Sequence, residues 1–480
     1  MSIDIPQPAD TSRKWWAMVV VGLGIFMGTL DMSSVNVSLP TLVQELETDF
    51  ATIQWVIVGY VLVVTSMMLG AARLGDMYTK KNLYNWGQVI FVFGSLLSGL
   101  APNVGWLIAF RILQGVGSVI MQALGSAIIV EVFPPSERGR AMGIIGGIVS
   151  VGIASGPAIG GMIIGMAGWR WVFLMKVPVG ILALAVSLRY LPAIQPIEKD
   201  ERFDVIGACI LLCALVCFAL GMTMGQSRGF YDSAVQTLLV VSAAGVTAFL
   251  IVEKRMSQPM LDLSLFRNLR FSLSLLIGLI SFMVMGGMFI LPFYLQLVKG
   301  YPTFQIGFMM MASPVAMGMV APLAGSMSDR FGTRVISLVG LITIVGGCYA
   351  VGTLTVDTSV VEYLARVFVV GMGMGIFQSP NNSAIMGAAP LERLGVASGL
   401  MALARNLGTT IGIPMMGAIC TAIVVAAAGL PLSNIADAPP AALIQGINGT
   451  FAVSAIVLGV ASLLYGMALL VDSRRGMPSA

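Results

Sequence analysis

Fourteen long apolar stretches follow one another through the chain, and they constrain its fold more than any other feature. A membrane-spanning helix needs about 20 mostly apolar residues. Short segments carrying most of the proline and charge join the stretches and leave no room for a soluble domain. The sequence therefore predicts an all-α integral membrane protein with 14 spans, at about 15–37, 52–74, 83–101, 104–131, 140–164, 169–190, 205–225, 234–253, 271–297, 303–325, 333–354, 360–380, 395–427 and 447–470.

Composition points the same way and removes several classes of function. Of the 480 residues 57% are hydrophobic and 10% charged, whereas soluble domains carry about 25% charged residues. The net charge of +4 and the lack of a basic block interleaved with aromatics give no support for a nucleic-acid partner. There is no histidine, the five cysteines lie in apolar runs, and no nucleophile–base pair or phosphate-binding loop occurs. We therefore expect no metal, no cofactor and no enzyme, and transport driven by an ion gradient.

The distribution of lysine and arginine predicts the orientation in the membrane. With the N-terminus in the cytoplasm and strictly alternating spans, 19 basic residues fall on the cytoplasmic side and only Arg170, Arg228 and Lys299 fall outside. Because cytoplasmic loops carry the excess of basic residues, both termini are expected in the cytoplasm. The lack of histidine and of loop cysteines suits the inner, plasma membrane of a prokaryote.

The chain also contains an internal duplication. Gly143, Gly152, Gly156 and Gly161 recur 256 residues later as Gly399, Gly408, Gly412 and Gly417, and Asp76 recurs near that offset as Asp329. Two like halves of six spans leave the seventh and eighth spans as an inserted hairpin. The expected domains are a six-helix bundle at 1–195, the hairpin at 196–255 and a second six-helix bundle at 256–480.

Four segments in order carry a resemblance to a known family. They are the segment from Leu30 to Pro40 (LDMSSVNVSLP), that from Arg111 to Gly117 (RILQGVG), that from Gly152 to Gly161 (GIASGPAIGG) and that from Trp169 to Phe173 (WRWVF). Together they resemble the fourteen-helix drug:proton antiporter branch of the major facilitator superfamily. The resemblance covers essentially the whole chain and implies the two-bundle fold of that superfamily, with Asp31 and Arg111 as the proton-coupling pair.

Asp31 is the only acidic residue well inside a predicted span, which makes it a functional candidate by default. It lies about 9–10 Å from the outer end of the first span, at 1.5 Å per residue, and Arg111 lies at a similar depth in the fourth span. An adjacent guanidinium stabilises the ionised carboxylate, whereas apolar surroundings stabilise its protonated form. A purely structural ion pair is the alternative.

Six further positions are candidates to line the substrate cavity because they place polar groups at membrane depth. Lys176 stands where the family usually has asparagine; its long side chain either extends outward to the membrane surface or faces the cavity and contacts Asp31 or an anionic substrate. Arg366 and Arg405 are expected to be the buried cations of the second half, which has no buried acid to pair with them, and backbone carbonyls or Gln378 are the expected partners of Arg405. Within the matching motifs, Asn36 and Gln114 are further cavity candidates.

Two more motifs are expected to serve the conformational change. Gly152, Gly156, Gly160 and Gly161 allow close helix packing in lipid, Pro157 bends the span, and the resemblance makes this segment the antiporter signature. At the cytoplasmic ends of spans 2 and 10, an acid can cap a facing helix in one conformation only. The corresponding gating-loop candidates are Asp76, Lys80, Lys81, Asp329, Arg330 and Arg334, with the first copy degenerate at Ala72, Met77 and Thr79.

The function expected from these features is proton-coupled export of hydrophobic or amphipathic small molecules by alternating access, of the multidrug-efflux type. An alternative is an exporter or flippase of a lipid or another anionic amphiphile, since buried cations outnumber buried acids. A membrane sensor or enzyme is a remote third possibility. The expected partners are the lipid bilayer, protons and the amphipathic substrate, and the chain is expected to act as a monomer.

Overall fold

The computed structural model describes residues 11–134, 137–192, 205–256, 265–390, 394–429 and 438–474, and its regular structure there is helical. The elements in the first half and the hairpin are α1 (Thr11–Glu45), α2 (Phe50–Ile53), α3 (Trp55–Met77), α4 (Lys80–Gly99), α5 (Val104–Val132), α6 (Arg138–Ala167), α7 (Arg170–Leu174), α8 (Lys176–Tyr190), α9 (Val205–Arg228) and α10 (Ser233–Arg255). Those that follow are η1 (Leu265–Arg267), α11 (Leu269–Met285), η2 (Gly286–Ile290), α12 (Leu291–Phe293), η3 (Tyr294–Val298), α13 (Thr303–Met310), α14 (Ala312–Phe331), α15 (Thr333–Val351), α16 (Val360–Ala388), α17 (Leu394–Ala428) and α18 (Pro440–Arg474).

These elements form the 14 expected spans, four of which are interrupted helices. The interrupted spans are α2 with α3, α7 with α8, α11 through η3, and α13 with α14. Thirteen spans within the described residues are long and apolar enough to cross a membrane. The fourteenth, α4, begins with Lys80, Lys81 and Asn82, and these polar residues lower its hydropathy. The last span begins at Pro440, seven residues before the predicted start.

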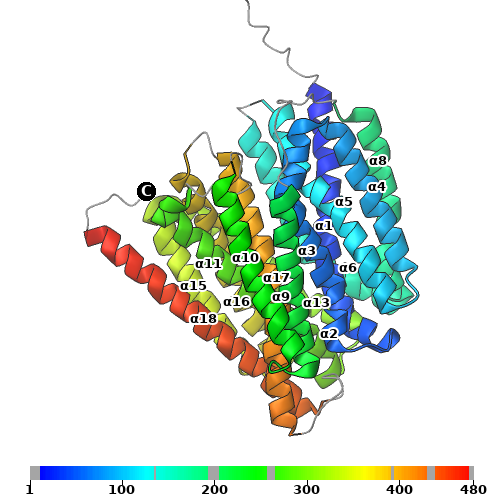
Figure 1. The fold of residues 1–480 in the computed structure, drawn as a ribbon, viewed down its shortest axis with the longest axis vertical. Helices are drawn as coiled ribbons and strands as arrows, with labels where there is room; N and C mark the ends of the chain where they lie inside the picture. The colour runs from blue at the N-terminus through cyan, green and yellow to red at the C-terminus, as the bar shows by residue number, and fades with distance from the viewer. Residues whose placement is uncertain are drawn as a thin grey trace, which may run out of the picture.

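The spans pack as two bundles joined by the hairpin (Figure 1). In the first half, α4 packs on α5, α5 on α3, and α1 on both α6 and α8. In the second half, α15 packs on α16, α16 on α14, and α11 and α18 on α17. Helix α9 pairs with α10 and lies against both α3 of the first half and α17 of the second. We call the end where α1 begins and α18 finishes the terminal end, and the opposite end the distal end (Figure 1).

The internal duplication is visible in the helix contacts. A Cβ atom on Gly152 or Gly156 of α6 would collide with Thr29 or Ser33 of α1. Their counterparts Gly408 and Gly412 of α17 would collide with α11 in the same manner, at Leu279 and Met283. Each glycine pair thus seats the fifth helix of a half on the first helix of that half. Small residues allow such close approach between membrane helices.

The last glycine of each set, Gly161 or Gly417, lies at a contact with the other half. A Cβ on Gly161 would lie 2.6 Å from the backbone oxygen of Thr303 in α13, and one on Gly417 would lie 2.5 Å from Gln54 beside α3. The halves also meet at the distal end through the rings of Phe50 and Phe293, whose centroids are 4.8 Å apart. The two halves are therefore closely packed at the distal end.

Toward the terminal end, α6 and the tenth span (α13 with α14) diverge. Gly146 precedes Pro157 by 11 residues on α6, and Gly318 follows Gly307 by 11 residues along the tenth span, which is about three helical turns in each case. Pro157 and Gly307 are in contact, with 2.2 Å from a Cβ on Gly307 to the Pro157 oxygen. A Cβ on Gly146 or on Gly318 would meet no atom within 4 Å. Three turns from their contact, α6 and the tenth span therefore no longer pack against each other at these two positions.

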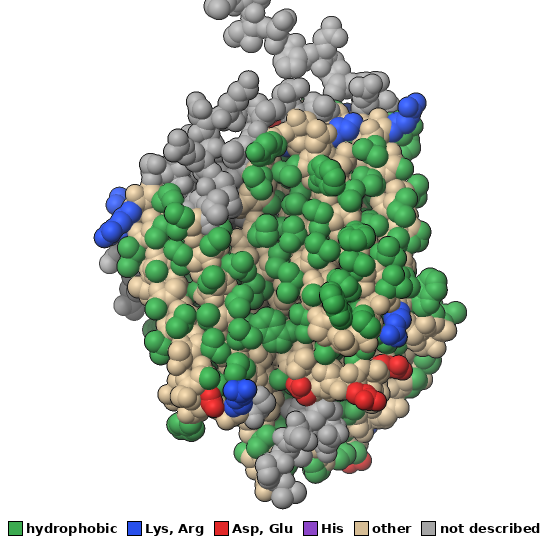
Figure 2. Space-filling model, turned by 45° about the vertical axis from the view of Figure 1, so that its right-hand side comes forward, with side chains coloured by type: hydrophobic (Ala, Val, Ile, Leu, Met, Phe, Trp, Pro, Cys, Tyr) green, Lys and Arg blue, Asp and Glu red, His purple; other side chains and the backbone are tan. Residues whose placement is uncertain are grey.

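One lateral face of the molecule carries a broad apolar band (Figure 2). Lysine, arginine and acidic side chains on that face lie toward its two ends, and the band between them is hydrophobic. Large exposed apolar side chains at helix positions that would face lipid include Met166, Leu188 and Val240, at 82%, 58% and 68% exposure. This distribution is the one expected where lipid replaces water as the solvent.

Candidate functional site

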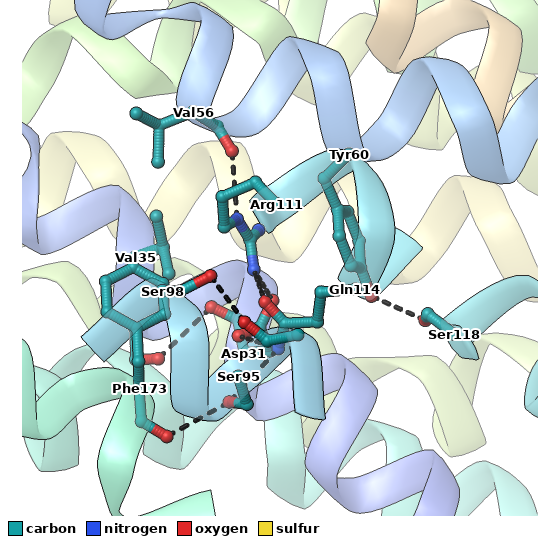
Figure 3. Close-up of polar contacts among 12 residues, drawn as sticks. Asp31, Val35, Val56, Tyr60, Ser95, Ser98, Arg111, Gln114, Ser118 and Phe173 are labelled. Carbon is teal, nitrogen blue, oxygen red and sulfur yellow. Dashed lines mark hydrogen bonds and ion pairs between the residues drawn. The ribbon is translucent and has the colours of Figure 1, made fainter. Parts of the chain in front are cut away.

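Asp31 is the centre of a dry polar cluster in the first half (Figure 3). The Nη1 atom of Arg111 donates to Asp31 Oδ2 at 2.6 Å, and the Nε2 atom of Gln114 donates to Oδ1 at 3.2 Å. The Nζ atom of Lys176 also donates to Oδ1. The side chains are fully buried, with 0% exposure for Asp31 and Arg111 and 1% for Lys176. We refer to Asp31, Arg111, Gln114 and Lys176 as the Asp31 cluster.

Arg111 is held in place by contacts beyond the carboxylate. Its Nε donates to the backbone oxygen of Val56 at 3.0 Å, and Nη1 also donates to Gln114 Oε1 at 2.6 Å. The guanidinium lies over the ring of Tyr60, 4.3 Å from its centroid (Figure 3). Nη2 is buried and has no hydrogen-bond partner among the described residues. A planar cation stacked on an aromatic ring in a dry site is held in one orientation.

Lys176 reaches the cluster because the sixth span is broken beside it. Pro178 has no N–H group to donate to the carbonyl of Leu174, four residues earlier, and its ring conflicts with that carbonyl. Helix α7 accordingly ends at Leu174 and α8 begins at Lys176. Of the two orientations left open by the sequence, the structure has the inward one: Nζ contacts Asp31 and lies 5.1 Å from the ring centroid of Phe173.

A second layer that the sequence did not single out supports the cluster. Gln114 Nε2 donates to the hydroxyl of Ser95 in α4, and that hydroxyl donates to the backbone oxygen of Phe173 at 3.0 Å. Tyr60 donates to Ser118 at 2.5 Å. Serines are common in membrane helices as local backbone partners, so no pattern in the sequence distinguished Ser95 from the others. The cluster thereby joins α1, α4, α5 and the α7–α8 break.

The cations expected in the second half are placed differently from each other. Arg366 is partly buried, with 24% of its side chain exposed, and its Nη1 lies 3.8 Å from Glu362, one turn away near the start of α16. Glu362 is itself 57% exposed, so the acid beside Arg366 is a surface residue rather than a buried one. Arg405 lies eleven residues into α17, is partly buried, and has no acidic partner among the described residues.

Two amide candidates, Gln378 and Asn36, have no side-chain hydrogen-bond partner among the described residues. Gln378 of α16 is partly buried and forms no hydrogen bond with Arg405 or any other described residue. Asn36 lies on α1 toward the distal end from Asp31, and its Oδ1 is buried without a partner. Neither amide joins the Asp31 cluster, so only Gln114 and Lys176 of the cavity candidates contact Asp31.

The first candidate gating loop is short, and the lysines that follow it contact neighbouring helices. Only Tyr78 and Thr79 separate α3 from α4, and Lys80 is buried against Glu131 of α5 at 2.8 Å. Lys81 donates to the backbone oxygen of Leu188 at 3.1 Å. Arg330 lies in the last turn of α14 and Arg334 in the first turn of α15. The side chains of Asp76 and Asp329 lie outside the described ones, so their capping role stays a prediction.

The inserted hairpin adds a polar contact that the sequence did not indicate. Gln226 Oε1 of α9 accepts hydrogen bonds from Gln54 of the first half and from Thr421 of the second, both at 3.3 Å. Trp55 also donates to Thr223 of α9 at 3.2 Å. Helix α9 therefore links the two halves near the distal end, where they are in contact.

Two like helical bundles that meet at one end, part toward the other and carry a buried ion cluster have the architecture of a membrane transporter. The chain belongs to the Major Facilitator Superfamily, whose family model matches residues 21–413.

Similar proteins include transporters of several compounds. The riboflavin transporter RibZ of Clostridioides difficile is 34% identical over 404 residues, covering 83% of this chain and 87% of that protein. The multidrug resistance protein Stp of Mycobacterium tuberculosis is 32% identical over 84% of this chain and 75% of its own length. The tetracenomycin C resistance and export protein of Streptomyces glaucescens is 29% identical over 86% of this chain and 77% of its own length.

Solved structures share the fold at low sequence identity. A bacterial homologue of the human lysosomal transporter Spinster, in an inward-facing and unoccupied conformation, matches with a TM-score of 0.67 at 16% identity, over 96% of this chain and 98% of that one. The nucleoside transporter NupG matches with a TM-score of 0.62 at 12% identity, over 94% of this chain and 99% of that one. At these identities the likeness concerns the fold alone.

Proposed function

We propose that this protein is a proton-coupled antiporter that exports hydrophobic or amphipathic small molecules. The observation that carries the proposal is Asp31, a carboxylate with 0% exposure at membrane depth, held by Arg111 and Lys176. A charge at the bilayer centre costs at least about 2.5–3.5 kcal/mol, so such groups persist where transport or proton transfer needs them. The drug-resistance relatives favour an amphipathic substrate over a sugar or an ion.

The contacts between the halves support alternating access. With the terminal end in the cytoplasm, the closed distal end faces outward, and the unpacked positions Gly146 and Gly318 lie toward the cytoplasm. The inward-facing state would then load substrate from the cytoplasm and release it after the distal contacts separate. Cysteines introduced at positions 230 and 300 should react with an impermeant reagent on intact cells, and those at 2 and 479 should not. Labelling of position 2 or 479 from outside contradicts this orientation.

The function is tested with purified protein in proteoliposomes carrying an imposed pH gradient. Riboflavin and the cationic dye ethidium are the first two probes, since both are fluorescent amphiphiles. We expect an outwardly directed proton gradient to drive accumulation of at least one probe inside the vesicles. We expect Asp31→Asn to lose that accumulation. Transport of a probe that ignores the gradient in both proteins would identify a uniporter instead.

A second candidate function, export of a lipid or another anionic amphiphile, is favoured by Arg405. This arginine lies five residues, or about 7.5 Å, toward the terminal end from Thr410, which contacts Thr65 across the two halves at 2.9 Å. It is partly exposed and has no acidic partner among the residues described. An unpaired cation at this depth would attract an anionic group, because the charge is weakly screened there.

A further inference from the structure

The Asp31 cluster holds two cations against one carboxylate. Arg111 contacts Oδ2 and Lys176 contacts Oδ1, and the described residues around them add no second acid. With all three groups ionised, the cluster carries a net charge of +1 in a site without measurable solvent exposure. Among the described residues, the one other titratable group in contact is Tyr60, whose ring lies under the Arg111 guanidinium and whose hydroxyl donates to Ser118.

The hydrogen bonds around Asp31 are arranged for a carboxylate rather than for a carboxylic acid. Both oxygens receive N–H donors, from Arg111 on one and from Gln114 and Lys176 on the other. A proton added to either oxygen would need an acceptor, and the groups that contact these oxygens, on Arg111, Gln114 and Lys176, are all donors. Protonation of Asp31 beside two cations would also raise the net charge of the cluster to +2. Asp31 is therefore a poor place to put the exchanged proton while Lys176 is charged.

Lys176 is the member that can release a proton without breaking the cluster. Arginine stays protonated in proteins, whereas an ammonium group has three N–H bonds and keeps two after losing one proton. The only described hydrogen bond of Lys176 Nζ is the one to Asp31. A neutral amine can keep that hydrogen bond, and its formation brings the cluster to zero net charge.

We infer that Lys176 carries the proton that this transporter exchanges, with Asp31 as the fixed anion that holds it and Arg111 as the permanent counter-charge. In this step one N–H bond of the Lys176 ammonium breaks, its electron pair stays on Nζ, and the proton passes to water on the side to which the site is open. Reprotonation from the other side restores the +1 state. The inference rests on the proposed proton coupling and assigns the atom that performs it.

The change of charge is a property of the whole cluster. A cycle between net charges of 0 and +1 changes the electrostatic field around Asp31 and needs no loss of its hydrogen bonds from Arg111 and Gln114. Coupled groups that interact this closely titrate as a unit, so the two states of Lys176 are states of the whole cluster. An arginine at position 176 would hold the cluster permanently at +1 and would stop the cycle while preserving a donor to Asp31.

The test compares Lys176→Arg with Lys299→Arg, a matched change at an exposed lysine that donates to the Val356 backbone. Lys176→Arg is expected to lose gradient-driven accumulation of riboflavin or ethidium by at least tenfold while retaining gradient-independent counterflow of the same probe. Lys299→Arg is expected to retain both. Full gradient-driven accumulation by Lys176→Arg overturns the inference and leaves proton coupling intact. A wild-type protein that ignores the gradient overturns the proposed function itself.

Infrared difference spectroscopy provides a second test that does not depend on the transport activity of a variant at 176. Acidification across the working range should produce no carboxylic-acid C=O band that disappears in Asp31→Asn. It should produce a lysine ammonium signal that is absent from Lys176→Met. A carboxylic-acid band assigned to Asp31 would place the proton on the carboxylate and would overturn the inference.

Discussion

Gly161 of α6 and Gly307 of α13 approach so closely that neither position has space for a side chain. A Cβ on Gly161 would lie 3.0 Å from the Cα of Gly307, and one on Gly307 would lie 3.1 Å from the Cα of Gly161. The contact joins the two halves at the distal end. It exists only while that end is closed, so its loss should act on the conformational equilibrium.

Gly161→Ala is expected to favour the conformation that is open at the distal end. Overpacking costs about 1–3 kcal/mol, and here that cost falls on the closed conformation alone. The population of the open conformation should rise by about tenfold or more. Labelling of a cysteine placed at Gln296, in a background without the native cysteines, reports the change. Gly165→Ala is the matched control, since its Cβ would meet only Phe304 at 3.7 Å; equal labelling of the two variants contradicts this account.

Asp31→Asn should lower stability as well as coupling. It leaves Arg111 and Lys176 buried without their anion, and loss of one partner from a buried pair costs about 3–5 kcal/mol. The double variant Asp31→Asn with Lys176→Met removes one of the unpaired cations and should regain part of that loss. Thermal unfolding in detergent measures both effects. Asp232→Asn, at a helix cap on the surface, is the control; a double variant no more stable than Asp31→Asn would mean that the excess charge is not the cause.

Gln226→Leu should weaken the connection that the hairpin makes between the halves. The substitution removes the acceptor for Gln54 and Thr421, and each lost hydrogen bond is worth about 0.5–1.5 kcal/mol. We expect a lower unfolding temperature and faster labelling at the distal end. Gln236→Leu on the exposed side of α10 is the control. Unchanged labelling in Gln226→Leu would show that α9 covers the halves without stabilising their closure.

Arg405→Ala tests whether the unpaired arginine selects for negative charge. Competition against one fluorescent probe, with competitors matched in hydrophobicity and varied in charge, is the measurement. One unit charge at about 4 Å is worth several kcal/mol at an effective dielectric near 20, so anionic competitors should weaken by tenfold or more and neutral ones little. Permanent dications that win in the wild type and are unaffected by Arg405→Ala would remove the anion-exporter alternative.

Much of the fold follows from the sequence because it rests on hydrophobic length and on repetition. The run lengths gave the spans, and the glycines recurring at 256 residues marked contacts that the structure places at equivalent positions in both halves. The pairing of Asp31 with Arg111 was predicted from their similar depth, since both lie about equally far from the same membrane surface. The span boundaries were less certain, as shown by the early start of α18 at Pro440.

What the sequence left open depends on rotation about a helix and on side-chain reach. Lys176 had two possible directions, and the break caused by Pro178 together with the position of Asp31 selects one of them. Arg366 lies 3.8 Å from Glu362, and hydropathy does not show that the rotation of α16 and the reach of the two side chains bring these groups together. The bridge made by Gln226 requires α9 to lie against α3 and α17, and no pattern within the chain encodes that placement.

The most direct test of the central claim measures protons and substrate in the same vesicles. Proteoliposomes containing the wild-type protein and an internal pH indicator receive a transported probe from outside, with no initial pH gradient and with the membrane potential clamped. The account predicts that entry of the probe is accompanied by exit of protons, seen as internal alkalinisation, and that Asp31→Asn abolishes the pH change. Equal probe entry with no pH change in the wild type would contradict proton antiport.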